Sequence, residues 1–301
     1  MGHIFYEPTR RDFLRISAAS VASLVTLGGC GSSKRRTAAI DLGETHWVFM
    51  ADTHIPANCE ESYNSFYPCE NLKKTVGQLS GGGFDGISIA GDLARLEGKL
   101  SDYERLKEIL TPLAEQTPIF MALGNHDDRK NFYKVFTDLP GERQPATGKH
   151  VTVVDTGPVR IIMLDSLMFV NKTPGLLGHA QRKWLGEYLA GNDETPTILC
   201  LHHSLADHDG DLLDVPRLFD MVKPIRKVKA IVYGHSHAYR YSEFEGIHLI
   251  NVPATGYCFG KSAPVGWVEA TLTARGGQFK LHAIGGNMTG DKSVTELPWR
   301  A

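Results

Sequence analysis

Gly124-Asn125-His126-Asp127 follows the apolar run 118–122, which places these polar residues just beyond the carboxyl end of an expected strand. Four further polar clusters follow apolar runs in the same way, among them the runs 47–50 and 230–233. Side chains this far apart in the chain meet only if a fold gathers the strand ends on one rim of a sheet. The other clusters are Asp52-Thr53-His54, Gly91-Asp92, His202-His203 and Gly234-His235-Ser236-His237.

The donor types in these clusters predict a site for two metal ions. Carboxylate, amide and imidazole ligands together suit iron, manganese, zinc or nickel as divalent or trivalent ions. Two ions about 3.5–4 Å apart need a bridging ligand, and Asp92 is the natural candidate because a carboxylate offers two oxygens. Asn125 adds a neutral amide oxygen.

The spacing within the clusters supports convergence. Asp52 and His54 are two residues apart, so in an extended strand end they point the same way, and the same holds for His235 and His237. The glycines beside the ligands are expected to permit turns of positive φ. These glycines are Gly91, Gly124 and Gly234.

Each polar cluster alone could be a surface loop or a turn, but that interpretation does not explain why all five clusters occur in this order, each after an apolar run. The pattern D-x-H, GD, GNH-D/E, H, GH-x-H resembles the calcineurin-like metallophosphoesterase superfamily from about residue 46 to about residue 283. The resemblance implies one metal held by Asp52, His54, Asp92 and His237. It implies a second metal held by Asp92, Asn125, His202 and His235.

The resemblance leaves one ligand open and assigns the chemistry. Ser204 stands where the family usually has proline, so the choice of His202 over His203 stays open. A hydroxide that bridges the metals would attack phosphorus, and His126 would stabilise the transition state or protonate the leaving alkoxide. Asp127 would either orient His126 or cap the following turn.

The segment 124–129 with Phe132 and Phe136 resembles the cyclic nucleotide phosphodiesterase branch of the superfamily. The resemblance implies small phosphate-ester substrates, foremost phosphodiesters of the cyclic nucleotide or glycerophosphodiester type. Arg129 would bind a phosphate or diester oxygen, with a surface salt bridge as the alternative, and His203 is a second substrate-binding candidate. A phosphomonoesterase of the cell envelope and a non-catalytic metal-dependent binding protein are the other functions considered.

Composition is that of one large globular domain: 301 residues, 42% hydrophobic and 22% charged. The formal net charge of −2 argues against a general nucleic-acid binder, and no basic, aromatic-rich groove element favours a nuclease. Beyond residue 30, no apolar run is long enough to span a bilayer.

The first thirty residues resemble a twin-arginine signal peptide, with Arg10-Arg11 before Phe13-Leu14 and an uncharged stretch from Ile16 to Gly29. A short amphipathic helix is the alternative. Leu27-Gly28-Gly29-Cys30 resembles a lipobox, in which Cys30 would carry a lipid anchor. We therefore expect a signal over 1–30, a polar tether over 31–44 and a metallophosphoesterase domain over 45–301. The twin-arginine export machinery would deliver it to the periplasm or to the membrane as a lipoprotein.

An oxidising compartment permits disulfides among the remaining cysteines. Cys59 and Cys69 flank a loop after the first metal motif, and a bridge there would pin an active-site insertion. Cys200 lies in an apolar run and is expected to be a buried thiol, whereas Cys258 has no evident partner. The chain has no Cys-x-x-Cys pair, which argues against a soft-metal site.

Apolar runs alternate with amphipathic stretches, and this mixture predicts an α/β fold. The family resemblance specifies a four-layer α/β/β/α sandwich of two mixed sheets flanked by helices. Ser101 with Glu104 is expected to form a capping box at the start of one helix. Strands are expected near 46–51, 86–90, 118–122, 151–154, 160–164, 197–201, 229–233, 239–244, 247–251, 266–273 and 278–283. Helices are expected near 69–80, 101–115, 128–136, 178–191 and 214–224.

Overall fold

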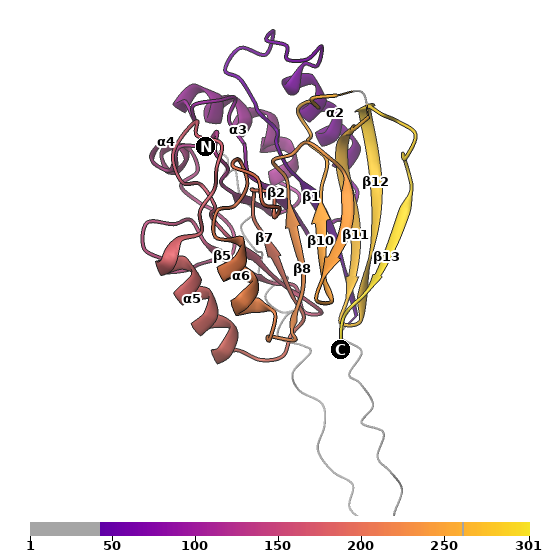
Figure 1. Ribbon diagram of the computed structural model, residues 1–301. Helices are drawn as coiled ribbons and strands as arrows, with labels where there is room; N and C mark the ends of the chain where they lie inside the picture. The colour runs from indigo at the N-terminus through magenta and orange to yellow at the C-terminus, as the bar shows by residue number, and fades with distance from the viewer. Residues whose placement is uncertain (1–42, 261) are drawn as a thin grey trace, which may run out of the picture.

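The computed structural model describes residues 43–260 and 262–301, which form two β-sheets packed face to face with helices on both outer faces (Figure 1). The first sheet has the strand order β13-β12-β11-β1-β2-β3, and the second has the order β4-β5-β6-β7-β8-β10-β9. Both sheets mix parallel and antiparallel pairs. The predicted four-layer sandwich is therefore confirmed.

The strands of the described residues are β1 Glu44–Met50, β2 Gly86–Ala90, β3 Ile119–Ala122, β4 Glu142–Arg143, β5 Thr152–Asp155, β6 Arg160–Met163, β7 Thr197–Cys200, β8 Val228–Tyr233, β9 Arg240–Phe244, β10 Ile247–Asn251, β11 Pro264–Thr273, β12 Gly276–Gly286 and β13 Val294–Pro298. The helices are α2 Pro68–Leu79, α3 Leu100–Ala114, α4 Arg129–Val135, α5 Gly178–Gly191 and α6 Val215–Val222.

Alternation along β1 shows how the layers form. Trp47 and Phe49 face the second sheet and join the apolar cluster between the two sheets. Val48 and Met50 face the other way, into the cluster that the first sheet shares with α2, α3 and α4. A third cluster lies between the second sheet and the helices α5 and α6. Because successive side chains of a strand point to opposite faces, one apolar strand supplies two interfaces.

Parallel pairing aligns the strand ends that carry the polar clusters. β1, β2 and β3 pair in parallel within the first sheet, and β6, β7, β8 and β10 do so within the second. Their carboxyl ends therefore share an edge in each sheet. A parallel bridge between Ala51 and Ala254 links the extension of β1 to the segment after β10 at this edge.

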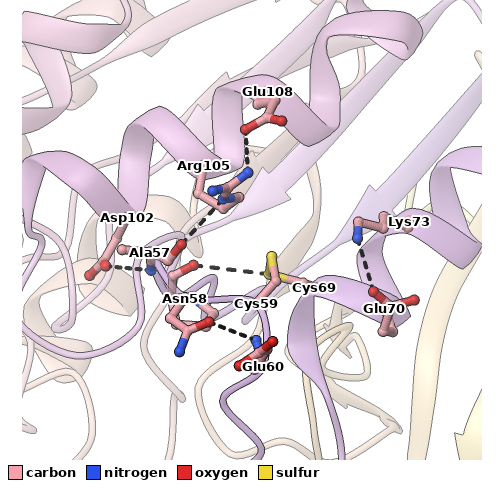
Figure 2. The surroundings of a disulfide bond; sticks show 11 residues. Ala57, Asn58, Cys59, Glu60, Cys69, Glu70, Lys73, Asp102, Arg105 and Glu108 are labelled. Carbon is pink, nitrogen blue, oxygen red and sulfur yellow. Dashed lines mark hydrogen bonds and ion pairs between the residues drawn. A yellow bond between two sulfur atoms is a disulfide. The ribbon is translucent and has the colours of Figure 1, made fainter.

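The disulfide between Cys59 and Cys69, which the sequence left open, is present and joins the segment after β1 to the first turn of α2 (Figure 2). The same segment is tied to α3, because the Ala57 amide donates to Asp102 Oδ1 at 2.9 Å and Arg105 Nε donates to the Ala57 carbonyl at 3.2 Å (Figure 2). The insertion is thus held at its base by a covalent bond and by two contacts to a helix.

The cysteine predictions agree with the structure, since Cys200 is a buried free thiol in β7 and Cys258 is free and buried. Three details of the sequence analysis were wrong. Ser101 forms no capping box, because α3 begins at Leu100 and its N-cap position makes no side-chain bond. The expected tether ends too late, because Glu44 already belongs to β1.

The third error is that two strands were missed. β4 has only two residues, both exposed, and β13 is an edge strand whose side chains are exposed or partly buried. Neither segment carries an apolar run of the kind that marked the other strands.

The expected signal peptide over 1–30, its lipidated Cys30 and the tether up to residue 42 lie outside the described residues, and they stay predictions. Within the described part of the chain, no helix has both the length and the apolar character that crossing a bilayer requires.

Candidate metal centre

The polar clusters that follow five strands meet at one rim of the sandwich. Backbone hydrogen bonds join the segments to one another, as when the Asp52 amide donates to the Gly91 carbonyl at 3.0 Å and the Gly234 amide donates to the His202 carbonyl at 3.0 Å. The candidate ligands come from the ends of both sheets: Asp52 and His54 after β1, Asp92 after β2, Asn125 after β3, His202 after β7, and His235 and His237 after β8.

The sequence analysis expected ligands such as Asp52 and His54 to continue the extended strands, but the structure shows that they do not. Ten described residues other than glycine have positive φ, and half of them are expected ligands. A side chain in this region costs on the order of 1–3 kcal/mol and persists only where its surroundings hold it. Backbone strain therefore concentrates at the site. The five strained ligands are Asp52, His54, Asp92, His235 and His237.

Asp52, His54 and His237 form the first cluster, and all three side chains are buried. His54 Nε2 lies 3.1 Å from His237 Nε2, and His237 Nε2 lies 3.3 Å from Asp52 Oδ1. Their donor atoms thus surround one small volume, as the predicted first metal site requires.

The second cluster lies beside the first and shares Asp92 with it. His202 Nε2 is 3.2 Å from Asn125 Oδ1, 3.1 Å from His235 Nδ1 and 3.2 Å from Asp92 Oδ2. The same Asp92 Oδ2 lies 3.7 Å from His54 Nε2 in the first cluster. The carboxylate therefore stands between the two clusters, which is where a bridging ligand must be.

Each of the four ligand imidazoles binds a backbone carbonyl through the nitrogen that points away from the cluster. A carbonyl only accepts hydrogen bonds, so that ring nitrogen carries the proton and the facing nitrogen of a neutral ring is a bare acceptor. The pairs are His54 Nδ1 with Arg95 O (3.2 Å), His202 Nδ1 with Ala90 O (2.8 Å), His235 Nε2 with Gly210 O (2.9 Å) and His237 Nδ1 with Tyr257 O (2.7 Å).

Unprotonated imidazole nitrogens 3.1 Å apart, as in the pair of His54 Nε2 and His237 Nε2, repel each other unless a cation lies between them. A carbonyl that holds the far side of each ring is the usual support of a metal-ligating histidine. Burial lowers the pKa of His54 to about 3 and that of His235 to about 4, so both rings are neutral near pH 7. The residues present therefore fit metal ions.

His202 differs from the other rings. Burial alone would lower its pKa, but Asp92 and Asp52 raise it to about 9. The same contacts hold the pKa of Asp92 well below its usual range, although burial opposes this. Metal binding to this cluster must displace the His202 proton, so the affinity is expected to rise with pH.

The glycines matter mainly because they lack a side chain. A Cβ on Gly124 would lie 2.2 Å from Asp92 Oδ1, and one on Gly234 would lie 2.3 Å from Asp52 Oδ2. Of the three glycines expected to have positive φ, only Gly91 does, at 81°. The prediction was therefore right for Gly91 and wrong for Gly124 and Gly234, which instead give carboxylates room.

One short segment after β2 organises the site. Asp92 supplies the shared carboxylate, and the Arg95 carbonyl accepts from the ring of His54. The next carbonyl, that of Leu96, accepts from His126 Nδ1 at 2.8 Å. The segment 92–96 thus supplies one ligand, Asp92, and holds the rings of His54 and His126.

Asp127 holds this segment in place, and neither role expected of it matches its contacts. Its buried carboxylate accepts from the amides of Gly124, Leu93 and Ala94 and from the Tyr103 hydroxyl. It does not contact the ring of His126, and the residue that caps α4 is Asp128. Asp127 is a positioning residue that ties the loops after β2 and β3 together.

His126 lies at the open edge of the clusters. Its Nε2 is 3.9 Å from Asp92 Oδ2, and its side chain is 19% exposed, whereas those of His54 and His202 are 1% and 0% exposed. A ring that borders the metal cluster and reaches solvent can contact a substrate.

The two predicted substrate contacts are not supported. Arg129 forms a two-pronged ion pair with the buried Asp165, through Nε at 2.6 Å and a terminal nitrogen at 2.8 Å, and it also binds the Leu167 carbonyl. Its role is thus a salt bridge, although a largely buried one. His203 is fully buried, with Nδ1 2.7 Å from Ser166 Oγ, so its ring does not reach solvent.

Sequence reasoning missed Tyr103 and Tyr257. Tyr103 is a buried residue of α3, and nothing in the sequence marked its hydroxyl as a partner of a buried carboxylate. Tyr257 supplies the carbonyl for His237, and its ring packs 4.9 Å from that of His54 and 4.6 Å from that of His237. No motif includes it, because it reaches the site only through the segment after β10.

Residues 46–239 match the model of the calcineurin-like phosphoesterase family, which is more than half of the chain. The chain belongs to this family. It is therefore a metal-dependent phosphoesterase, and the clusters described above are the site at which this activity is expected.

Several curated relatives are similar along most of their length. A probable cyclic nucleotide phosphodiesterase of Rhodococcus erythropolis is 30% identical over 76% of this chain and 77% of its own length. The cAMP/cGMP dual specificity phosphodiesterase of Mycobacterium tuberculosis is 29% identical over 76% and 73%. A 3',5'-cyclic adenosine monophosphate phosphodiesterase of Haemophilus influenzae is 28% identical over 71% and 76%.

Solved structures share the fold at low identity. A dimetal phosphatase of Danio rerio superposes with a TM-score of 0.68 at 13% identity, covering 85% of this chain and 99% of that one. PhoD superposes with a TM-score of 0.54 at 12% identity, covering 84% of this chain and 68% of that one. These likenesses concern the architecture alone.

Asp92→Asn should strip metal from both clusters, because an amide cannot offer two anionic oxygens to two ions. Metal analysis of the purified variant measures this directly. Asp128→Asn is the matched control, since an asparagine also caps a helix and the residue holds no metal. An Asp92→Asn protein that keeps two ions per chain and full turnover would show that the bridge is assigned wrongly.

His202→Ala should lower metal content at the second cluster, while His203→Ala should leave it closer to wild type. The physical reason is that His202 Nε2 lies 3.2 Å from Asp92 Oδ2, whereas His203 is bonded to Ser166. Metal content of both variants at equal protein concentration is the measurement. A larger loss in His203→Ala would move the ligand to His203.

Proposed function

We propose that this phosphoesterase binds two metal ions and hydrolyses phosphodiesters, with cyclic nucleotides foremost and glycerophosphodiesters as a second type. The observation that carries the proposal is the position of His126, whose ring stands partly exposed at the edge of two donor clusters that share Asp92. Two clusters with one shared carboxylate favour two ions rather than one.

The metal ions would lower the pKa of a water molecule and neutralise charge on the phosphoryl oxygens. The chain's own residues orient the substrate and handle the leaving group. The bond from His126 Nδ1 to the Leu96 carbonyl turns Nε2 toward the clusters. From that position a protonated Nε2 can donate to the leaving alkoxide, which is the role of a general acid.

Arg129, the cation three residues from His126, gives no support for a monoester, which brings one negative charge more than a diester, because Asp165 neutralises this arginine. The names of the similar proteins point to cyclic nucleotides as the substrate class. A non-catalytic binding protein is disfavoured because His126 and all the expected ligands are present.

The function is tested with a substrate panel on the manganese-loaded protein. We expect hydrolysis of bis-p-nitrophenyl phosphate and of 3',5'-cyclic AMP, with p-nitrophenyl phosphate turned over more slowly. Initial rates at matched concentrations decide the order. Preference for the monoester would replace the proposal with a phosphomonoesterase, and absence of turnover with metal bound would favour a binding protein.

His126→Ala should separate metal binding from catalysis. The ring contacts the Leu96 carbonyl and faces the substrate, so metal content should stay near wild type. The turnover number kcat should fall by roughly 10²- to 10⁴-fold, the usual contribution of a general acid. Loss of metal from this variant would instead make His126 a ligand.

A further inference from the structure

We propose that Phe259 is a specificity-determining residue, whose ring stacks against a flat aromatic group on the substrate, such as a nucleobase. The inference rests on the proposed phosphodiesterase function and deepens it. The ring of Phe259 would favour esters that carry a planar heteroaromatic ring over esters with aliphatic arms, such as glycerol esters.

Phe259 combines exposure with contact to a metal ligand. Its side chain is 63% exposed, yet its ring centroid lies 4.3 Å from that of His237, with 31° between the planes. One face of the phenyl ring is therefore covered by a ligand imidazole, while much of the ring remains accessible. A planar group attached to a phosphate at the metal clusters would find this surface beside it.

Phe259 belongs to a group of exposed apolar side chains around the site, here called the apolar rim. Single exposed apolar residues are ordinary, but a group of them around one polar site indicates a binding surface. Tyr63 and Phe259 are in ring contact with residues of the site, and Leu96 and Phe169 belong to segments whose backbone is hydrogen-bonded to His126 or Asn125. The members are Tyr63, Leu96, Phe169 and Phe259.

The contacts that place the rim are specific. The Leu96 carbonyl binds His126, and two residues after Phe169 the Asn171 amide donates to the Asn125 carbonyl at 2.6 Å. Tyr63 packs on Tyr257 with ring centroids 4.5 Å apart, and Tyr257 in turn contacts His54. Tyr63 and Phe259 thus lie beside the first cluster, and the segments of Leu96 and Phe169 are tied to the loop that carries Asn125 and His126.

Phe259 is held in position before any substrate arrives. Its ring meets that of Tyr257 edge-on at 5.6 Å. Tyr257 also packs on Tyr63, over whose ring the Arg95 guanidinium lies at 4.3 Å. Tyr63 sits in the segment that the Cys59–Cys69 disulfide closes. A preformed ring costs little ordering entropy on binding, so its stacking energy is available to the ligand.

The chemistry of stacking defines the substrate class. A nucleobase presents a broad π-face, and one base–aromatic stack contributes about 1–3 kcal/mol to binding. Glycerol, choline and ethanolamine arms have no such face. Because stacking tolerates different bases, Phe259 should favour nucleotides as a class and larger bases over smaller ones.

The test compares two ligands that differ only in the base: 5'-AMP and ribose 5-phosphate. Both carry the same phosphate, so the ratio of their dissociation constants isolates the contribution of the ring. Calorimetric titration of the manganese-loaded, full-length protein measures both constants without any turnover. We expect wild type to bind 5'-AMP about 5- to 100-fold more tightly than ribose 5-phosphate, the range of one stack.

Phe259→Ala should abolish this preference by weakening 5'-AMP alone, with ribose 5-phosphate within about twofold of wild type. Phe259→Trp should restore the preference, whereas Phe259→Leu, which is apolar but not planar, should not. Phe244→Ala is the matched control, because Phe244 is also exposed but lies at the end of β9, where it packs on Phe219 of α6.

Equal weakening of both ligands by Phe259→Ala would overturn the proposal, since Phe259 would then only support His237. No change with either ligand would also overturn it and would leave the rim as a contact surface for a membrane or another protein. Hydrolysis of bis-p-nitrophenyl phosphate is assayed separately on each variant. A protein that binds 5'-AMP through Phe259 but hydrolyses no diester would refute the proposed function and leave the stacking site standing.

Discussion

The site depends on one buried carboxylate that never touches a metal. Asp127 is fully buried and accepts hydrogen bonds from amides of two different loops and from the Tyr103 hydroxyl of α3. Burial, together with the nearby charge of Asp92, raises its pKa to about 7. A charge placed there is tolerable only because several donors converge on it, and the same donors fix the loops that carry Asp92 and His126. The carboxylate therefore converts two flexible loops into one rigid support.

Rigidity is needed because the ligands themselves are strained. Asp52, Asp92 and His235 adopt positive φ values, and His54 and His237 present bare nitrogens to each other 3.1 Å apart. Neither feature would persist in a loop free to relax. The parallel strands behind the loops, the carbonyls that hold the rings and the absence of a side chain at Gly124 all act against relaxation. A bound cation would relieve the repulsion between the facing ring nitrogens, and its binding energy would stabilise the strained loops.

The strand ends that carry the ligands were predicted well, because they follow from local patterns, whereas the four-layer arrangement followed from the family resemblance. An apolar run followed by His or Asp marks a strand end, and the order of the clusters matches one family. Sequence reasoning failed where the role of a side chain depends on a partner that is distant in the chain. Asp127 pairs with amides of a loop 34 residues away, so no local pattern distinguishes a loop brace from a helix cap. For Arg129 the sequence offered a salt bridge as the alternative role, but it could not name the partner, because Asp165 lies 36 residues away.

Two sets of residues have separate roles at the site: the expected metal ligands and the apolar rim. The expected metal ligands are buried, apart from the partly exposed His235, and they are held by backbone groups, which any sequence with the same loops can supply. The apolar rim is exposed and held by side chains. The Arg95 guanidinium lies over the ring of Tyr63, Tyr63 packs on Tyr257, and Tyr257 packs on the ring of His237. A disulfide closes the segment that carries Tyr63, but no covalent link touches the ligands themselves. The reactive centre is thus stabilised by the core of the fold, whereas the surface that selects the substrate needs its own support. A change in the rim can therefore alter which ester is bound while the metal clusters stay as they are.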